Sequence, residues 1–134
     1  MPNIPRPMQI FIASIPYDDG NGEKTRPALV IKPSLTKTGV LKITSQYESK
    51  SPAIQRLYFT IKHWREAGLN KPSYVDIHTV YAIPTSTITA RRPIGKLAQT
   101  DVYALLDLVM ATEAHSRNIG QGGQYKNDKG GKIR

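Results

Sequence analysis

The sequence predicts a small, mainly β domain with some α structure (α+β), in which five or six short strands form a strongly bent sheet or barrel with one C-terminal helix packed against it. Short segments rich in β-branched residues dominate the first 83 positions, and one strongly amphipathic helical pattern follows at residues 101–114. The chain has 134 residues, which suffices for one modest hydrophobic core. Its hydrophobic content of 39% and charged content of 22% are near globular averages, so extensive disorder is not expected.

The strands are predicted where short apolar segments lie between turn signals. Three prolines make residues 1–9 an irregular arm. The predicted strands are residues 10–15, 27–32, 40–45, 56–61 and 74–83, with a short extended piece at 94–97. Ser51-Pro52 leaves an alternative open for the fourth strand, because serine followed by proline also begins helices.

The helix at residues 101–114 has signals at its start and along one face. Thr100 can cap the first turn, and Asp101 suits the positive end of the helix dipole. Five apolar residues at helical spacing are predicted to face the core: Val102, Leu105, Leu106, Val109 and Met110. A separate helical turn at residues 63–67 is expected to end at Gly68, because glycine readily adopts the left-handed conformation that ends helices.

The charge distribution indicates a polyanionic partner. The formal net charge is +9. The folded domain is expected to span residues 10–114, followed by a flexible basic tail at 115–134 that holds five basic residues and one acidic residue. The remaining excess of +5 lies before the tail. Such a surface favours nucleic acid or an acidic protein.

Several other classes of protein are not expected. The chain has no cysteine, which excludes disulfides and a cysteine nucleophile and is compatible with a cytoplasmic location. It has no apolar run long enough for a membrane span, and its polar, proline-rich start does not resemble a signal peptide. No spacing of His, Asp and Glu resembles a metal site, so no metal or other cofactor is predicted.

The most informative segment is a polar, glycine-rich loop between the first two predicted strands. Arg26 lies at the exit of this loop, directly before Pro27, which favours an extended backbone at the preceding residue. A permanent positive charge is thereby fixed on a rigid scaffold. A second polar group, Thr44-Ser45-Gln46, ends the next strand and is expected to lie beside it.

Four segments of the chain resemble the PemK/MazF family of toxins from bacterial type II toxin–antitoxin modules. They are PYDDGNGEKTRPALVI at residues 16–31, ITSQ at 43–46, WREAGLNKPS at 64–73, and IGKL at 94–97 followed by the helix. The third resembles the W-x-x-A-G-L-x-x-P-S stretch of the PemK-like branch. The resemblance covers about residues 10–112 and includes neither the arm nor the tail.

The resemblance implies a fold, an activity and partners. The fold is a compact SH3-like or CcdB-type barrel of five to seven short strands with a C-terminal helix, usually in a homodimer. Active members are metal-independent endoribonucleases that cut single-stranded RNA, often mRNA, and leave 2′,3′-cyclic phosphate and 5′-hydroxyl ends. A cognate acidic antitoxin usually covers the RNA groove.

The family's loop arginine corresponds to Arg26, and its Thr/Ser element to Thr44 and Ser45. RNA carries its own nucleophile, the 2′-hydroxyl, so the protein has to orient the phosphate, stabilise developing charge and manage two protons. A guanidinium group suits the electrostatic task, because it binds phosphate oxygens with two hydrogen bonds. Arg26 in a surface salt bridge and Thr44 as a strand residue with a satisfied hydroxyl remain the alternatives. Neighbouring strand residues face opposite sides, so only one of Thr44 and Ser45 can face the groove. Thr44 is favoured by its position in the motif.

His78 is a further catalytic candidate, because imidazole can carry protons near neutral pH. In a regular strand Asp76 would share the sheet face of His78. The two side chains are then expected either to pair, with Asp76 orienting the imidazole, or to make a polar contact across the face.

The candidates for RNA binding lie on loops and strand ends. They are Asp19, Gly20, Lys24, Thr25, Gln46, Asp76, Arg91 and Arg92. For Asp19 a turn-forming role is the alternative, for Gly20 a backbone role, and for the arginine pair a solvated turn. Trp64 and four tyrosines, Tyr47, Tyr58, Tyr74 and Tyr81, are able to stack on bases or to pack in the core.

A non-catalytic binder on the same fold is the alternative function. It would be either a poison of a protein target, as in the related CcdB fold, or a degenerate toxin that binds only RNA or its antitoxin. Thr25 stands where many relatives carry a second basic residue, and Asp76 where many members of the branch carry arginine. Both departures weaken the catalytic prediction or change the sequence preference.

Overall fold

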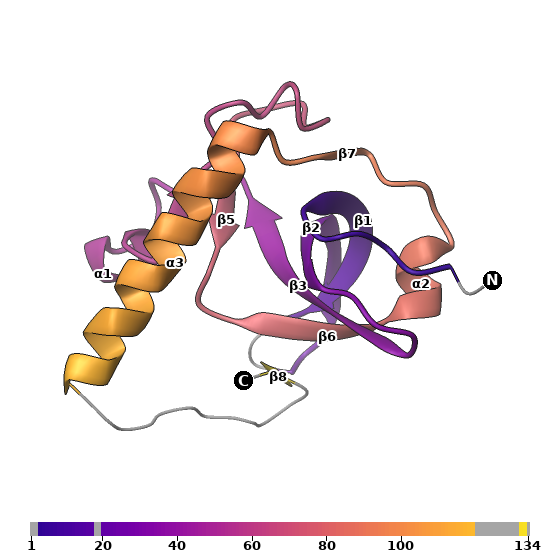
Figure 1. Ribbon diagram of the computed structural model, residues 1–134, viewed down its shortest axis with the longest axis horizontal. Helices are drawn as coiled ribbons and strands as arrows, with labels where there is room; N and C mark the ends of the chain where they lie inside the picture. Colours follow the sequence, from indigo (N-terminus) through magenta and orange to yellow (C-terminus); the bar gives the residue numbers. More distant parts are fainter. Residues whose placement is uncertain (1–2, 18–19, 120–131, 134) are drawn as a thin grey trace.

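The computed structural model describes residues 3–17, 20–119 and 132–133. The strands are β1 (Gln9–Pro16), β2 (Glu23–Lys32), β3 (Lys37–Thr44), β4 (Tyr58–Thr60), β5 (Tyr74–Asp76), β6 (Val80–Pro84), β7 (Gly95–Lys96) and β8 (Lys132–Ile133). The helices are α1 (Pro52–Gln55), α2 (Thr85–Thr89) and α3 (Gln99–Ile119). The predicted fold class is confirmed: a curled antiparallel half-barrel sheet with a C-terminal helix (Figure 1).

Strand β3 is the centre of the curl. The main path of the sheet runs β4-β5-β3-β2-β1-β7. One side of β3 pairs with β2, and its other side pairs with β6 over its first half and with β5 at its end. Two strands therefore diverge from the same edge of β3, and the sheet bends between them.

The two faces of the sheet bury separate clusters, because successive strand residues point to opposite sides. One cluster combines residues of β1, β2 and β3 with Leu105 of α3; its largest fully buried members are Ile10, Leu29, Ile43, Ile61 and Leu105. The other lies on the opposite face, where Phe11, Ala28 and Val40 meet β6 and Ile88 of α2. A fully buried Ile or Leu contributes about 1.5–3 kcal/mol, so both clusters hold the sheet in its bent form.

Helix α3 is longer than predicted and packs through a narrower stripe. It begins at Gln99 and continues to Ile119. Leu105 is buried, and Val102 and Val109 pack against the first cluster as predicted. The prediction was wrong for Leu106 and Met110, which are 45% and 66% exposed. The helix contacts the sheet on one side only, so this neighbouring row of apolar residues faces outward.

Asp101 does more than suit the helix dipole. Its carboxylate is buried and accepts hydrogen bonds from the backbone amides of Lys62 and His63, at 3.2 and 2.8 Å. These contacts join the start of α3 to the turn that follows β4. The predicted end of that turn is confirmed, because Gly68 has a φ of +91°.

Two predicted elements differ in detail. The region after Ser51 contains both alternatives: the Ser51 hydroxyl accepts the Ile54 amide at the start of α1, and strand β4 follows. The predicted strand at 74–83 is two strands, β5 and β6, interrupted at residues 77–79. Helix α2 was not predicted, because its sequence, TSTIT, is rich in β-branched residues.

The ends of the chain are partly ordered against the sheet. The arm has no regular structure over residues 3–6, as predicted. Residues 115–119, expected in the flexible tail, belong to α3, and β8 pairs with Val80 and Tyr81 of β6. Residues 120–131 of the predicted tail lie outside the described residues.

Candidate functional site

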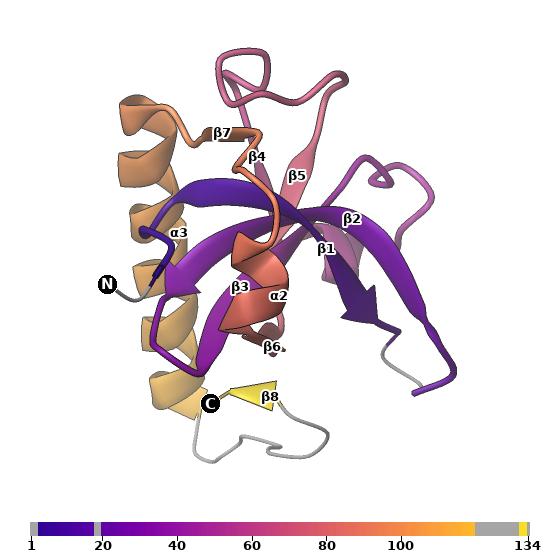
Figure 2. The ribbon, with the colours of Figure 1, turned by 90° about the vertical axis from the view of Figure 1, so that its right-hand side faces the viewer.

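Arg26 lies where the β1–β2 ribbon separates from the rest of the sheet. It is half-buried on β2 and directly opposite Ala13 of β1. The β2–β3 pairing ends at Ala28 and Lys42, next to Pro27, which has no amide hydrogen to donate. Beyond this point β2 pairs only with β1, and Figure 2 shows the ribbon extending away from the body of the sheet.

Arg26 and Thr44 occupy matching positions on neighbouring strands. Each lies two residues beyond the last pair, Ala28 and Lys42, on the same side of it. Because strand residues alternate and paired residues share a face, Arg26, Lys42 and Thr44 all belong to one face of the sheet. The sequence-based expectation that the two polar spots lie beside each other agrees with this register. Lys24, opposite Ile15, adds a third cation to this face. We call Lys24, Arg26 and Lys42 the basic strip.

Thr44 is positioned by a hydrogen bond to the segment that follows it. Its side chain is almost buried, with 8% exposure, and its Oγ1 accepts the amide of Gln46 at 3.0 Å. A hydroxyl that accepts one hydrogen bond still has its own hydrogen to donate. Ser45 is exposed and lies just after the strand, so the two hydroxyls do not act at one place.

Asp76 connects the basic strip to the segment after β5. Its Oδ2 lies 3.6 Å from Nζ of Lys42, and its Oδ1 accepts the backbone amide of His78 at 2.9 Å. The imidazole Nδ1 of His78 instead lies 3.1 Å from the Thr79 hydroxyl. Asp76 therefore does not orient the His78 ring, and His78 is exposed between two strands rather than within one.

A pocket of about 530 Å³ opens beside Thr44 and includes Ser45 and Gln46 in its lining. Its aromatic wall comes from Tyr47 and Tyr74, whose rings are stacked with centroids 4.4 Å apart. Tyr74 pairs with Thr44 across β5 and β3, so both side chains are on the face of the basic strip.

The other aromatic candidates are divided between several places. Tyr58 is tilted against Tyr47, with ring centroids 6.2 Å apart. Trp64 packs against the first core cluster and carries the Arg65 guanidinium 4.4 Å from its ring centroid. Tyr81 is buried in the second cluster. The tyrosines that line the pocket are thus Tyr47 and Tyr74.

The glycine-rich loop has the backbone role expected of its glycines. Gly20 and Gly22 have φ values of +79° and +103°, and both make backbone hydrogen bonds with Tyr17. Asp18 and Asp19 lie outside the described residues. Thr25 pairs with Ser14, and their hydroxyls are 3.3 Å apart on the face opposite Arg26. Thr25 is therefore separated from the basic strip.

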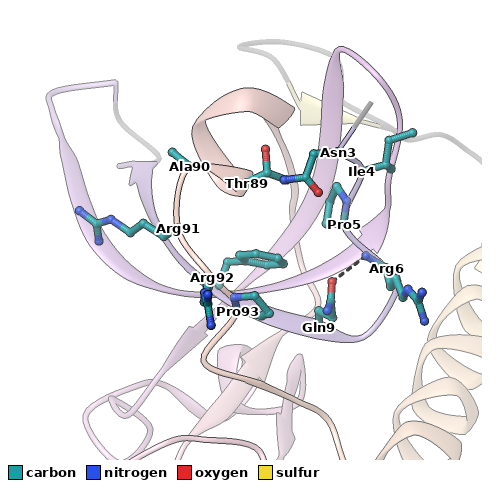
Figure 3. Close-up of a pocket in the computed structure, with 11 residues that line it drawn as sticks. Asn3, Ile4, Pro5, Arg6, Gln9, Thr89, Ala90, Arg91, Arg92 and Pro93 are labelled. Atoms are coloured by element: carbon teal, nitrogen blue, oxygen red, sulfur yellow. Dashed lines mark hydrogen bonds between the residues drawn. The ribbon is translucent and has the colours of Figure 1, made fainter. Parts of the chain in front are cut away.

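Arg91 and Arg92 lie at a different place from Thr44. They follow α2, are exposed, and line a second pocket of about 400 Å³ together with Arg6 of the arm (Figure 3). Sequence reasoning missed Lys42 and Arg6. Lys42 had a signal, because it lies two residues before Thr44 and so shares its strand face.

Neither a metal cluster nor a membrane span is found in the described part of the chain. Over residues 3–17, 20–119 and 132–133, no three His, Asp or Glu side chains are grouped so that they could hold a metal ion. None of the helices in the same residues is long and apolar enough to cross a membrane.

The sequence was compared with protein families and with curated proteins. The family described as PemK-like, MazF-like toxin of type II toxin–antitoxin system matches residues 6–112, most of the chain. No curated protein matched. The matched residues include Arg26, Thr44 and the whole basic strip.

Proposed function

Because the chain belongs to the PemK-like, MazF-like toxin family of type II toxin–antitoxin systems, we propose that it is a metal-independent endoribonuclease that cuts single-stranded RNA, including mRNA, in the cytoplasm. The observation that carries this proposal is the matching position of Arg26 and Thr44 on neighbouring strands of one sheet face. A cation and a hydroxyl are there available to one phosphate group.

The proposed step is an internal transfer that needs no external nucleophile. The 2′-oxygen of a ribose attacks the adjacent phosphorus, and the bond from phosphorus to the 5′-oxygen of the next nucleotide breaks. The 2′-hydroxyl loses a proton and the leaving 5′-oxygen gains one. The products are a 2′,3′-cyclic phosphate and a 5′-hydroxyl end, so atoms and charges balance without water.

We assign the stabilisation of negative charge to Arg26. Its guanidinium can bind two non-bridging phosphate oxygens at once. Thr44 is assigned a hydrogen bond to the same phosphate through its hydroxyl hydrogen. Its Oγ1 is held in place by the hydrogen bond that it accepts from the Gln46 backbone amide. Lys42, held by Asp76, adds a second positive charge close to this phosphate. Such preorganised donors typically contribute 10²–10³-fold to the rate.

His78 is the candidate for proton transfer. It is exposed on the segment after β5, and Asp76 links its backbone to Lys42 of the basic strip. Since the His78 imidazole contacts Thr79 and not Asp76, its support is weaker than that of Arg26. Ser45 is a secondary candidate, because it lines the pocket next to Thr44.

Bases next to the cut are proposed to enter the pocket beside Thr44. The stacked rings of Tyr47 and Tyr74 offer an aromatic surface to an unpaired base, and stacking of this kind contributes about 1–3 kcal/mol per base. The Gln46 side chain has both donor and acceptor groups for a base edge.

The partners proposed are an acidic antitoxin and a second copy of the chain. The basic strip suits an acidic segment that competes with RNA for the same cations. For the homodimer, support comes from the outward row of apolar residues on α3: Tyr103, Leu106 and Met110, which are 62%, 45% and 66% exposed. Exposed apolar rows of this kind mark protein interfaces.

The decisive experiment is incubation of the purified protein with a defined RNA in EDTA, followed by mapping of both ends of each product. The proposal expects cyclic phosphate and 5′-hydroxyl ends, and a loss of at least about 100-fold in the Arg26→Ala variant. Thr25→Ala, next to Arg26 but on the opposite face, is the matched control. Wild-type cleavage by Arg26→Ala would reject the site. RNA that stays intact but bound would favour the non-catalytic binder instead.

A further inference from the structure

The pocket lined by Arg91 and Arg92 lies between two segments that are distant in the sequence. One wall is the N-terminal arm from Asn3 to Gln9, and the other is the connection after α2, from Thr89 to Pro93. Figure 3 shows the arm and this connection on opposite sides of the pocket, with arginines on both. Its volume of about 400 Å³ is in the range of small-molecule sites.

The charged residues of the lining are all basic. Arg6, Arg91 and Arg92 are among the lining residues, which include no Asp or Glu, and Figure 3 shows the Arg6 and Arg91 side chains directed outward at opposite sides of the pocket. The remaining polar groups are amides and a hydroxyl, while Phe11 and prolines supply apolar surface. Guanidinium groups bind phosphate oxygens through paired hydrogen bonds, and flat apolar surface suits a sugar or base. This combination matches a nucleotide better than a bare inorganic anion.

The arm is held in place by a strained turn. Met8 has a φ of +74°, which is rare for a bulky residue, and Gln9 donates its amide to the Arg6 carbonyl at 3.2 Å. With Pro7 before it, Met8 occupies the position of a type II turn that normally requires glycine. The left-handed conformation is unfavourable for a residue with a Cβ.

Several contacts offset this strain and fix the direction of the arm. The Met8 amide donates to the Val30 carbonyl at 2.7 Å, and its carbonyl accepts the Leu97 amide at 2.9 Å. Its side chain packs against the first core cluster. The Arg6 amide also donates to Oε1 of Gln9 at 2.8 Å, the dashed line in Figure 3. Arg6 is thereby attached to the sheet at the edge of the pocket. Strain retained in this way points to a function.

The pocket and the site around Arg26 lie beside the same strand, β1. Phe11 and Ala13 are two residues apart on β1 and share a sheet face, so they are separated by about 7 Å. Ala13 is directly opposite Arg26. The second core cluster fills the sheet face between these two places, so a strand of RNA with one phosphate at Arg26 reaches the pocket by passing outside this cluster.

We propose that this pocket binds a phosphate-bearing nucleotide of single-stranded RNA at a position removed from the cut. The inference rests on the proposed RNA-cleaving function and extends it: RNA is gripped at two places, the cut at Arg26 and a distal anchor between the arm and the connection after α2. The contacts of the anchor are to phosphate and sugar, so the anchor adds affinity for long RNA without selecting its sequence.

The test uses uncleavable RNA, so that binding is measured separately from cleavage. The ligands are random-sequence RNA pools of 4 and 12 nucleotides, in which a 2′-O-methyl group blocks the attacking hydroxyl. Fluorescence anisotropy measures their affinity for the protein between 50 and 200 mM salt. The double variant Arg91→Gln/Arg92→Gln is compared with Arg56→Gln/Lys62→Gln. The control removes the same charge from exposed residues that line neither pocket. Thermal melts confirm that both variants are folded.

The expected result is a loss of at least about 10-fold in affinity of the Arg91/Arg92 variant for the 12-nucleotide pool, with the 4-nucleotide pool changed less than about 2-fold. The slope of the logarithm of its RNA affinity against the logarithm of salt concentration becomes shallower by about 1.4. This is the change expected when two phosphate contacts to a single strand are lost. Arg6→Gln is expected to lower the 12-nucleotide affinity in the same way. An equal loss in the control variant, an equal loss for the short pool, or no loss would overturn the proposal.

Two further outcomes separate this inference from the proposed function. If the wild-type protein cleaves no RNA but the length-dependent loss is observed, the nuclease assignment fails and the anchor stands. If the arginine variant loses only binding to a polyglutamate peptide measured in parallel, the pocket serves an acidic protein and the RNA anchor is rejected.

Discussion

Gly68 and Gly95 lie backbone against backbone, with no room for a side chain on either. A Cβ on Gly68 would lie 2.1 Å from the Ile94 carbonyl oxygen, and a Cβ on Gly95 would lie 2.1 Å from the Ala67 carbonyl oxygen. The contact joins the turn that follows β4 to strand β7, two of the segments that carry the family resemblance.

Alanine at either glycine is expected to destabilise the protein. Gly68→Ala adds a backbone clash and a side chain at positive φ, for a loss of about 2–4 kcal/mol, and Gly95→Ala a clash alone, for about 1–3 kcal/mol. Urea unfolding measures both. Gly20→Ala is the matched control, because Gly20 also has a positive φ but nothing within 4 Å of its added Cβ. If Gly68→Ala costs no more than Gly20→Ala, the contact does not limit stability.

The Arg26→Lys variant tests whether Arg26 acts through two hydrogen bonds to the phosphate or through its positive charge alone. Lysine keeps the positive charge but loses the planar fork, so cleavage is expected to fall by at least about 10-fold while RNA affinity changes little. Single-turnover rates and anisotropy measure the two effects. An unchanged rate would mean that Arg26 acts only through its charge.

The Thr44 hydroxyl is expected to matter through its oxygen and its hydrogen. Thr44→Ser retains both groups and is expected to remain within about 5-fold of the wild-type rate, whereas Thr44→Val removes the acceptor for the Gln46 amide and the donor to phosphate and loses at least about 100-fold. Thr25→Val, which removes a hydroxyl on the face opposite Arg26, serves as the control. Equal rates for Thr44→Val and Thr44→Ser would contradict this role.

Asp76 is expected to limit RNA affinity while it stabilises the fold. Asp76→Asn retains an acceptor for the His78 amide but loses the negative charge beside Lys42, so RNA is expected to bind several-fold more tightly at low salt. Asp76→Ala leaves the amide without this acceptor and costs about 1–3 kcal/mol of stability. Weaker RNA binding by Asp76→Asn would show that the carboxylate itself contacts the RNA.

The proposed homodimer is expected to form through the outward row of α3. Leu106→Glu is expected to convert the dimer to a monomer, because a charge in an apolar interface costs several kcal/mol of association. Light scattering after gel filtration measures the mass. Ala104→Glu, exposed on another side of α3, is the control. A dimer that survives Leu106→Glu would place the interface elsewhere.

Much of the fold follows from local signals in the sequence. Alternating β-branched segments located the strands around Arg26 and Thr44, and the position of Thr44 in the family motif favoured it over Ser45. The glycine at position 68 marked the end of its turn, because only a residue without Cβ takes that conformation easily.

The remaining features depend on contacts that local patterns do not contain. Helical spacing grouped Leu106 with Leu105, but only the width of the helix–sheet contact decides which of them is buried. The Asp76 carboxylate is held both by Lys42 on a neighbouring strand and by the backbone amide of His78, and the contact with Lys42 depends on the tertiary fold. The arm acquires its pocket through Met8, a residue with no propensity for such a turn.

The end of the β2–β3 pairing at Ala28 also has a mechanical consequence. The β1–β2 ribbon is anchored at one end, so bending or twisting it displaces a residue in proportion to its distance from the anchor. Arg26 lies two residues from the anchored end and is displaced little, while Lys24 and the turn glycines lie farther from this end and are displaced more. The outer part of the ribbon can thus move without displacing the cation at its base.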